Sequence, residues 1–240
     1  MKRSRGKIKG SHLKNFRITP IRSRVAVLAS GGLDSSVLLA DFARKGRRVF
    51  PIYIRAGLRW ERVELATLRK FIAALARDNI EEVAVLDFPT VDITRDHWSV
   101  TGKAVPGYRA SLASNYIPGR NLSLLTKAAM FCARNRIGEI AMAPLESNPF
   151  PDARPEFFRA VERAVKLGME LPLRVLTPFE GLEKSDVIRK GRALALELTL
   201  SCANPRGMLH CGACTKCAER IQGFHAAGIA DPTRYANNTG

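Results

Sequence analysis

The sequence predicts an α/β protein built on a doubly wound, parallel five-stranded sheet with a small C-terminal lobe. Two observations indicate the sheet: after a basic start, short apolar runs alternate with helix-length segments, and five such runs occur. A third indicates the lobe, because four of the five cysteines gather near the end of the chain, where that alternation stops. We therefore expect a basic, flexible arm at 1–23, an α/β domain at 24–196 and the lobe at 197–240.

The individual elements follow from hydrophobic periodicity and from the residues that interrupt it. Pro51 indicates that the second strand is not central along its whole length, because proline cannot donate a hydrogen bond to a neighbouring strand. Gly46 and Gly168 are expected to end the helices that they follow. Residues 89–118 lack periodicity, and so long a connection is usually functional or mobile. The expected strands are 25–30, 49–54, 82–88, 139–143 and 173–178, and the expected helices are 35–45, 61–77, 121–136, 156–168 and 184–196.

Charge is the most unusual feature of the composition, since the 240 residues carry a net charge of +17. The first 24 residues hold nine Lys or Arg and no acid. Such an arm can meet phosphates, including those of a nucleic acid, or it can be a solvated tail or a transit peptide. No apolar run approaches the roughly 20 residues of a membrane span. We therefore expect a cytoplasmic protein without membrane contact.

The most informative stretch is Ser-Gly-Gly-Leu-Asp-Ser-Ser at 30–36, which joins the first strand to the first helix. In an open parallel sheet, ligands bind beyond the carboxyl ends of the strands. Gly31 and Gly32 permit positive φ and a close approach of the ligand, and the helix N-terminus favours an anion. Asp34 can cap the helix or hold a magnesium ion that accompanies phosphates. The stretch matches neither the Walker A motif nor the glycine fingerprint of dinucleotide binding.

The clustered cysteines follow the spacing C-x8-C-x2-C-x2-C. In a chain without an export signal, such clustering favours a metal over disulfides. Four thiolates suit tetrahedral Zn²⁺, and a closed sulfur shell indicates a structural site that stabilises a lobe too small for its own core. His210 could replace one ligand, whereas Cys132 is expected to be a buried apolar residue. The expected zinc ligands are Cys202, Cys211, Cys214 and Cys217.

The loop resembles the pyrophosphate-binding loop of the PP-loop ATPases, which cleave ATP between the α- and β-phosphates and adenylate a substrate. The cysteine cluster and the segments "YIPGRNLSLLTKAA", "FPDARPEFFRAVERAVKLG" and "LTPFEGLEKSDVIRKG" resemble the 7-cyano-7-deazaguanine synthase family. The resemblance covers residues 24 to 235 and implies the PP-loop (HUP) fold. It implies contact with ATP at Ala29, Ser30, Gly31, Gly32, Leu33, Asp34, Ser35, Ser36, Val37, Leu38 and Leu39.

The activity that the resemblance implies converts 7-carboxy-7-deazaguanine, ammonia and ATP to 7-cyano-7-deazaguanine, through an acyl-adenylate and an amide, in a homodimer that uses Mg²⁺. The implied catalytic residues are Ser30, Asp34, Ser35 and Lys184, and the implied acceptor-binding residues are Arg120, Asn121, Glu146, Asp152 and Arg154. Each also has a structural interpretation. Asn121 could cap a helix, and Asp152 with Arg154 could be a surface ion pair.

The sequence departs from the family on the acceptor side. The family's Tyr-Gly-Gln-x-His segment is here "RAGLRWERVEL", and its Tyr-Pro-Asp-Cys is here Phe150-Pro-Asp-Ala153. One alternative is therefore a related enzyme that couples an adenylated deazapurine carboxylate to a macromolecular amine or modifies tRNA. Another alternative is a zinc-containing module that binds nucleic acid through the lobe and the arm.

Overall fold

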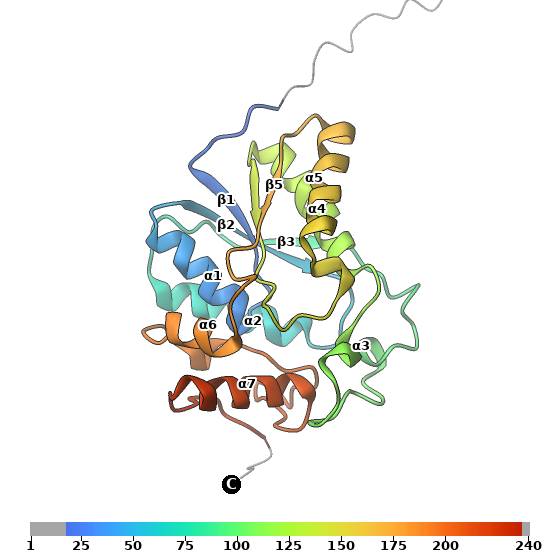
Figure 1. The fold of residues 1–240 in the computed structure, drawn as a ribbon, viewed down its shortest axis with the longest axis vertical. Helices are drawn as coiled ribbons and strands as arrows, with labels where there is room; N and C mark the ends of the chain where they lie inside the picture. Colours follow the sequence, from blue (N-terminus) through green and yellow to red (C-terminus); the bar gives the residue numbers. More distant parts are fainter. Residues whose placement is uncertain (1–17, 237–240) are drawn as a thin grey trace, which may run out of the picture.

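The computed structural model describes residues 18–236, and its centre is a five-stranded sheet in the order β3-β2-β1-β4-β5 (Figure 1). All four strand pairs are parallel. The strand order changes direction between β1 and β4, so the loops that leave these two strands open a crevice at the carboxyl edge. The strands are β1 (Arg24–Leu28), β2 (Arg48–Arg55), β3 (Ala84–Asp87), β4 (Glu139–Ala141) and β5 (Arg174–Leu176).

Helices cover both faces of the sheet, which confirms the doubly wound architecture (Figure 1). One face carries α1 (Leu33–Arg44), α2 (Glu61–Leu75) and α6 (Lys184–Lys190), and the other carries α4 (Arg120–Asn135) and α5 (Pro155–Met169). Beyond the carboxyl edge lie α7 (Thr215–Ala227) and the short α3 (Trp98–Thr101). None of the helices within residues 18–236 has the length and apolar composition needed to cross a bilayer.

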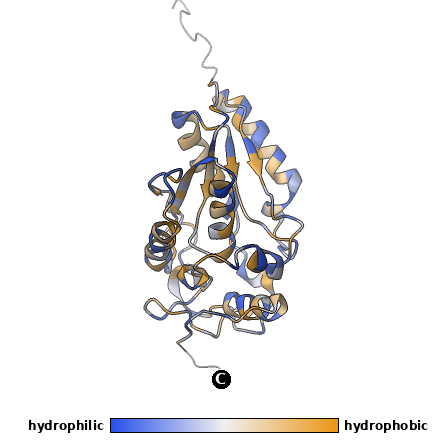
Figure 2. Cartoon of the chain, turned by 90° about the vertical axis from the view of Figure 1, so that its left-hand side faces the viewer, coloured by the Kyte–Doolittle hydropathy of each residue, from blue (hydrophilic) through white to orange (hydrophobic). Residues whose placement is uncertain are grey.

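Each face of the sheet has its own apolar core, which is why the strands lack a polar side (Figure 2). Leu38 and Leu39 of α1 are fully buried against the first face, and Leu125 of α4 is fully buried against the second. Burial of each such side chain contributes about 1.5–3 kcal/mol. The cores thus fix the helices and, through them, the loops at the carboxyl edge.

The strand prediction at Pro51 is confirmed, whereas two helix ends were predicted wrongly. Pro51 pairs with Val27 of β1, but the ladder with β3 begins only at the next residue. The helix expected at 184–196 ends at Lys190, because the chain turns at Gly191, where a Cβ atom would lie 2.7 Å from a methyl carbon of Val37. Gly168 does not end α5, which continues to Met169 before a left-handed residue.

The boundary of the predicted arm also changes. The backbone N–H of Ile21 donates to the carbonyl oxygen of Arg136 at 2.8 Å, and Pro20 packs against Gly138. Residues 18–23 are therefore part of the packed α/β domain. Residues 1–17, which hold most of the predicted arm, lie outside the described residues.

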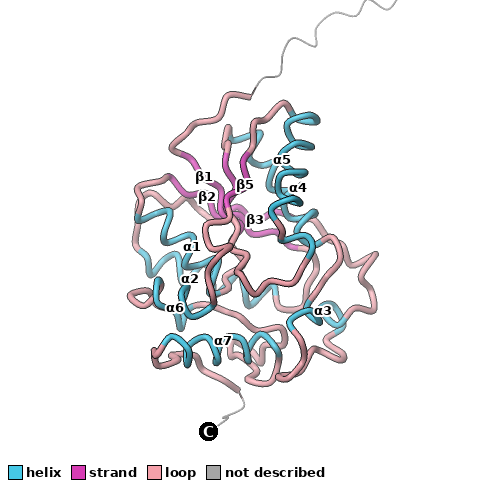
Figure 3. Tube along the Cα trace, in the orientation of Figure 1, coloured by secondary structure: helices cyan, strands magenta, loops and turns pink. Residues whose placement is uncertain are grey.

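The connection between β3 and α4 contains only α3 and the 3-10 turn η1 (Leu112–Asn115), as the sequence predicted for 89–118 (Figure 3). It is nevertheless tied to the C-terminal lobe. The N–H of Thr215 donates to the carbonyl oxygen of Pro106 at 3.1 Å, and the hydroxyl of Thr215 donates to the side-chain oxygen of Asn115 at 2.8 Å. The lobe therefore holds this connection in place beside the carboxyl edge.

Candidate active site

A cavity of about 300 Å³ opens at the carboxyl edge of the sheet. Its walls come from the β1–α1 loop, the first turns of α1, α2 and α4, and the C-terminal lobe. The position is the one that the switch in strand order predicts for a ligand. The predicted site residues that line it are Ala29, Ser30, Gly32, Leu33, Asp34, Ser35, Arg120, Asn121, Lys184 and the predicted zinc ligand Cys202.

The β1–α1 loop is held by its own serines. The Ser35 hydroxyl donates to the carbonyl oxygen of Gly32 at 3.2 Å and accepts from the backbone N–H of Ser30 at 3.2 Å. Gly32 is the N-cap of α1 and has no side chain with which to cap it. The N–H groups of a first helical turn have no intrahelical acceptors, and here the N-cap residue does not supply one. This turn is therefore suited to bind an anion.

Gly31 explains why a glycine is required in this loop. Its φ is +76°, and a Cβ atom there would lie 2.6 Å from the carbonyl oxygen of Glu64 on α2. Its own carbonyl oxygen accepts from the N–H of Leu200 at 2.8 Å. The loop is thus packed between α2 and the lobe. Of the other residues predicted to contact ATP, Ser36, Val37, Leu38 and Leu39 lie in the buried body of α1 and do not line the cavity.

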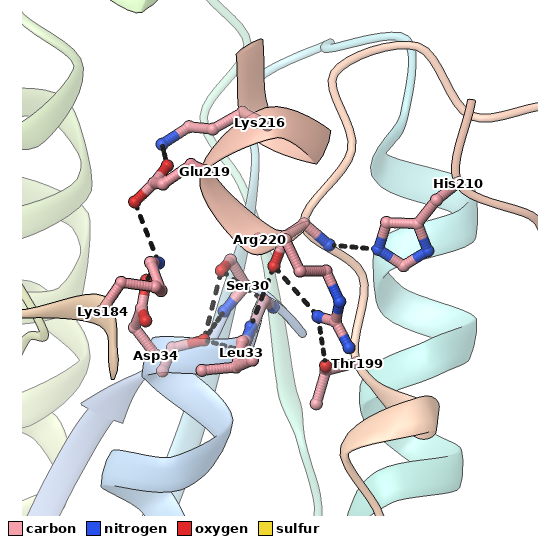
Figure 4. A network of polar contacts seen from close by, with 12 residues as sticks. Ser30, Leu33, Asp34, Lys184, Thr199, His210, Lys216, Glu219 and Arg220 are labelled. Atoms are coloured by element: carbon pink, nitrogen blue, oxygen red, sulfur yellow. Dashed lines mark hydrogen bonds and ion pairs between the residues drawn. The ribbon is translucent and has the colours of Figure 1, made fainter. Parts of the chain in front are cut away.

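Asp34 does not cap α1, because its carboxylate faces Lys184 instead (Figure 4). The Nζ of Lys184 lies 2.5 Å from Asp34 Oδ2 and 3.0 Å from Glu219 Oε1. These two carboxylates outweigh burial and raise the pKa of Lys184, so its amine stays charged. The second oxygen, Asp34 Oδ1, is buried without a hydrogen-bond partner among the described residues. That oxygen is available to a cation.

Glu219 and its neighbours on α7 were not predicted from the sequence. Lys216 donates to Glu219 at 2.9 Å, and the two lysines hold the pKa of this carboxyl down at about 2 against the effect of its burial (Figure 4). Gly223 permits this approach of α7 to α6, because a Cβ atom there would lie 2.4 Å from the side chain of Lys184. The C-terminal lobe therefore fixes the cation that faces the β1–α1 loop.

A second contact from the lobe to the loop passes through Arg220, which is 1% exposed. Its guanidinium donates to the Ser201 hydroxyl at 3.3 Å and to the Thr199 hydroxyl at 2.8 Å (Figure 4). Ser201 in turn accepts from the N–H of Leu33 at 3.4 Å. The sequence did indicate that Arg220 is buried, because Cys217, Arg220 and Phe224 recur at the spacing of one helix face. In the structure all three side chains are buried.

The residues predicted to bind the acceptor separate into two groups. Arg120 and Asn121, in the first turn of α4, line the cavity, and Arg120 Nε is buried without a partner among the described residues. Glu146 and Arg154 are exposed and do not line it. Asp152 is buried, but its carboxylate accepts from the N–H of Asn121 at 3.1 Å. Asn121 therefore does not cap α4; Asp152 does so from outside the helix.

We expect Asp152→Ala to lower the free energy of unfolding by about 1 kcal/mol, the usual cost of losing a helix cap. Asp152→Asn keeps an oxygen acceptor and should lose less. Urea titration of the two variants beside the parent protein measures the difference. If Asp152→Ala unfolds like the parent but raises the KM for the acceptor at least tenfold, Asp152 binds substrate and the capping role is wrong.

The cavity also has aromatic lining residues that were not predicted. Trp60 and Trp98 line the cavity and stack with ring centroids 5.6 Å apart. Trp60 is the residue before α2, and Trp98 comes from the connection that the lobe anchors. A flat aromatic wall of this kind suits a planar ring system.

The four clustered cysteines come together as predicted. Their sulfur atoms all lie within 4.8 Å of one another, with 3.8 Å between Cys211 and Cys217 and 3.6 Å between Cys214 and Cys217. A tetrahedral ion with metal–sulfur bonds of about 2.3 Å requires sulfur separations close to these. Gly212, with φ of +75°, makes the tight turn between Cys211 and Cys214. The cluster could hold one metal ion.

His210 is not part of this shell. Its Nε2, which can be followed in Figure 4, accepts from the N–H of Ser201 at 3.0 Å. Its ring packs edge-on against Tyr235. Burial lowers the pKa of His210 to about 3, so the ring is a neutral acceptor. His210 thus orients the Ser201 backbone near the β1–α1 loop.

The parallel sheet, the serine- and glycine-rich turn after β1 and the lysine facing it define an α/β nucleotide-binding protein of the PP-loop ATPase kind. The model of the family "Queuosine biosynthesis protein QueC" matches residues 24–228. The chain belongs to this family.

Curated relatives agree with the family match over nearly their whole length. A 7-cyano-7-deazaguanine synthase of Azoarcus sp. is 35% identical over 88% of this chain and 96% of the relative. The enzyme of the same description from Myxococcus xanthus is 36% identical over 90% of this chain and 98% of the relative. Among solved structures, an NMN synthetase from Francisella tularensis is similar with a TM-score of 0.44 and 13% identity, covering 86% of this chain and 78% of that one.

Proposed function

We propose that the protein is a 7-cyano-7-deazaguanine synthase, which uses ATP to convert the carboxylate of 7-carboxy-7-deazaguanine and ammonia to a nitrile. The observation that supports it best is the convergence of the β1–α1 loop, Lys184 and Arg120 on one cavity. The loop and Lys184 suit a triphosphate, and Arg120 suits a carboxylate. The family match and the synthase relatives supply the identity of the acceptor.

In this proposal the acceptor carboxylate attacks the α-phosphate of ATP, and pyrophosphate leaves. Negative charge grows on the leaving group, so the N–H groups of Asp34 and Ser35 at the α1 N-terminus and the charged amine of Lys184 stabilise it. The hydroxyls of Ser30 and Ser35 hold the loop in this shape. Arg120 would orient the acceptor carboxylate with its guanidinium, whose Nε has no partner among the described residues.

Two metal ions belong to the proposal. Asp34, through its unpartnered buried Oδ1, would hold a magnesium ion that neutralises phosphate charge. Cys202, Cys211, Cys214 and Cys217 would hold a structural zinc, since four sulfur ligands do not favour magnesium or calcium. A homodimer, and a contact of the basic N-terminal residues with nucleic acid, stay predictions.

Product analysis tests the function directly. The purified protein is incubated with 7-carboxy-7-deazaguanine, ammonium and Mg-ATP, and the products are followed by mass spectrometry. We expect the 7-cyano compound and AMP, with the amide as an intermediate. A product in which the deazapurine carboxylate is joined to tRNA or protein, without any nitrile, would contradict the proposal.

A further inference from the structure

Glu64 is a carboxylate in the cavity that has no part in the proposed binding of the nucleotide. It lies in the first turn of α2 and lines the cavity. Its Oε2 accepts from the Tyr53 hydroxyl at 2.8 Å. Among residues 18–236, no hydrogen bond reaches its other oxygen, Oε1. One carboxylate oxygen is thus oriented by the protein and the other stays available to a ligand.

Its neighbour Glu61 provides a contrast, because a structural role accounts for that side chain completely. Glu61 Oε1 accepts from the N–H of Ala56 at 2.7 Å, and both of its oxygens accept from the N–H of Gly57. Those bonds hold the turn that leads from β2 into α2. Within the described part of the chain the Glu64 carboxylate has no such backbone partners, so its position at the cavity calls for a different explanation.

Glu64 lies between the β1–α1 loop, which is proposed to bind the nucleotide, and Arg120, which is proposed to bind the acceptor. Its carbonyl oxygen packs against Gly31 of the nucleotide loop. Its carboxylate feels the positive charge of Arg120, the residue proposed to orient the acceptor. A group bound with its carboxylate at Arg120 and facing the β1–α1 loop would therefore present its reacting carbon near Glu64.

The surroundings of Glu64 give its carboxyl a pKa suited to proton transfer near neutral pH. Burial raises the pKa to about 7, although Arg120 and the Tyr53 hydroxyl act to lower it and Glu61 adds to the rise. The other charged groups that line the cavity, Asp34, Lys184, Lys216 and Glu219, gather at the end formed by α1, α6 and α7. A base with a pKa near the working pH is the most effective one.

We propose that Glu64 is the base that removes N–H protons during the nitrogen chemistry of the reaction, an inference that rests on the proposed function. In the first step, ammonia forms a C–N bond to the acyl-adenylate carbon. Glu64 takes a proton from that nitrogen. The bond between the acyl carbon and the phosphate oxygen of AMP then breaks, and AMP leaves with the electron pair of that bond. The product is the amide.

The same residue serves the second step. When a second ATP adenylates the amide oxygen, the nitrogen loses the first of its two protons to solvent, and the resulting imidate carries one N–H. Glu64 takes this proton, the N–H electron pair becomes the third C–N bond, and the C–O bond breaks to release AMP. Each step places one proton on Glu64, which returns it to solvent before the next.

Glu64→Gln tests the proposal because it keeps an acceptor for Tyr53 but cannot take a proton. Adenylation is measured alone as exchange of labelled pyrophosphate into ATP with the acceptor and no ammonia. Exchange should stay within threefold of the parent, whereas amide and nitrile formation should fall about 10²- to 10⁴-fold. Hydroxylamine in place of ammonia should restore acyl transfer, because its adduct is a stronger N–H acid and loses its proton to water. The exposed Glu156→Gln variant on α5 serves as the control and should match the parent.

Tyr53→Phe gives a second readout that does not depend on how well Glu64→Gln folds. The hydrogen bond from Tyr53 lowers the pKa of Glu64, so its loss should raise that pKa. Since only the deprotonated carboxylate accepts a proton, amide formation at constant free ammonia should rise through a pH near 7 in the parent and through a higher pH in Tyr53→Phe.

The inference is wrong if Glu64→Gln forms the nitrile at the parent rate, if exchange falls as much as amide formation, or if Tyr53→Phe leaves the pH profile in place. These outcomes differ from failure of the proposed function, in which the parent protein itself makes neither amide nor nitrile.

Discussion

Lys184→Met is expected to reduce adenylation by about 10²- to 10³-fold, the usual loss when one donor to a developing charge is removed. The Lys184 amine is the cation that the structure holds against the β1–α1 loop, between Asp34 and Glu219. Removing it leaves two carboxylates without a shared partner in a largely buried site, which costs about 3–5 kcal/mol of unfolding free energy. Pyrophosphate exchange measures the first effect and urea titration the second.

A double variant separates catalysis from stability. Adding Glu219→Gln to Lys184→Met removes one of the two carboxylates that faced the lysine, so the double variant should regain part of the lost stability and still fail to adenylate. If the double variant recovers both stability and exchange activity, Lys184 acts only as a structural partner of Glu219, and its role toward pyrophosphate is wrong.

Cys217→Ser should cause the second large loss, since this sulfur is fully buried at the centre of the cluster. Structural zinc sites in small peptides bind with about 10–16 kcal/mol, which matches or exceeds the stability of a typical domain. Loss of the metal should therefore unfold the lobe and release Thr215 from its contacts with the β3–α4 connection. We expect about one zinc per parent chain by atomic emission, none in the variant, and no product.

Tryptophan fluorescence reports this change without an activity assay. The chain has two tryptophans, and both Trp60 and Trp98 belong to the cavity wall. Cys217→Ser, or a strong chelator, should shift their emission to longer wavelength as the stacked pair becomes solvated. Cys132→Ala is the matched control, because Cys132 is a buried residue of α4 in the other apolar core, away from the cluster. A zinc-free protein with parental emission and activity would contradict the structural role.

Features of the site that are contiguous in the chain could be predicted from sequence. Ser30 to Ser36 form one turn, and the four cysteines fall within 16 positions, so spacing alone indicated an anion site and a metal site. The alternation of apolar runs sufficed for the sheet for the same reason. Glycine was less reliable at helix ends: Gly46 follows the end of α1, whereas Gly168 lies inside α5, where burial of an amphipathic face outweighs its low helix propensity.

The rest of the site depends on partners far apart in the sequence. Lys184 meets Asp34 across 150 positions, and nothing local to either residue signals the ion pair. Glu64 follows helical periodicity that equally fits a solvated face of α2, and only the approach of Tyr53 distinguishes it. Asp152 was expected to bind the acceptor, but its carboxylate caps α4. That cap is a contact between residues 31 positions apart, which a sequence motif does not reveal.

The position of Lys216 and Glu219 on α7 has a consequence for synthesis of the protein. Ribosomes make a chain from its N-terminus, and domains begin to fold in that order. A nascent chain that has reached α6 already holds every strand and the Ser-Gly-Gly turn, yet it lacks Glu219 and all four clustered cysteines. The cavity at the β1–α1 loop is therefore complete only once the last helix has emerged from the ribosome.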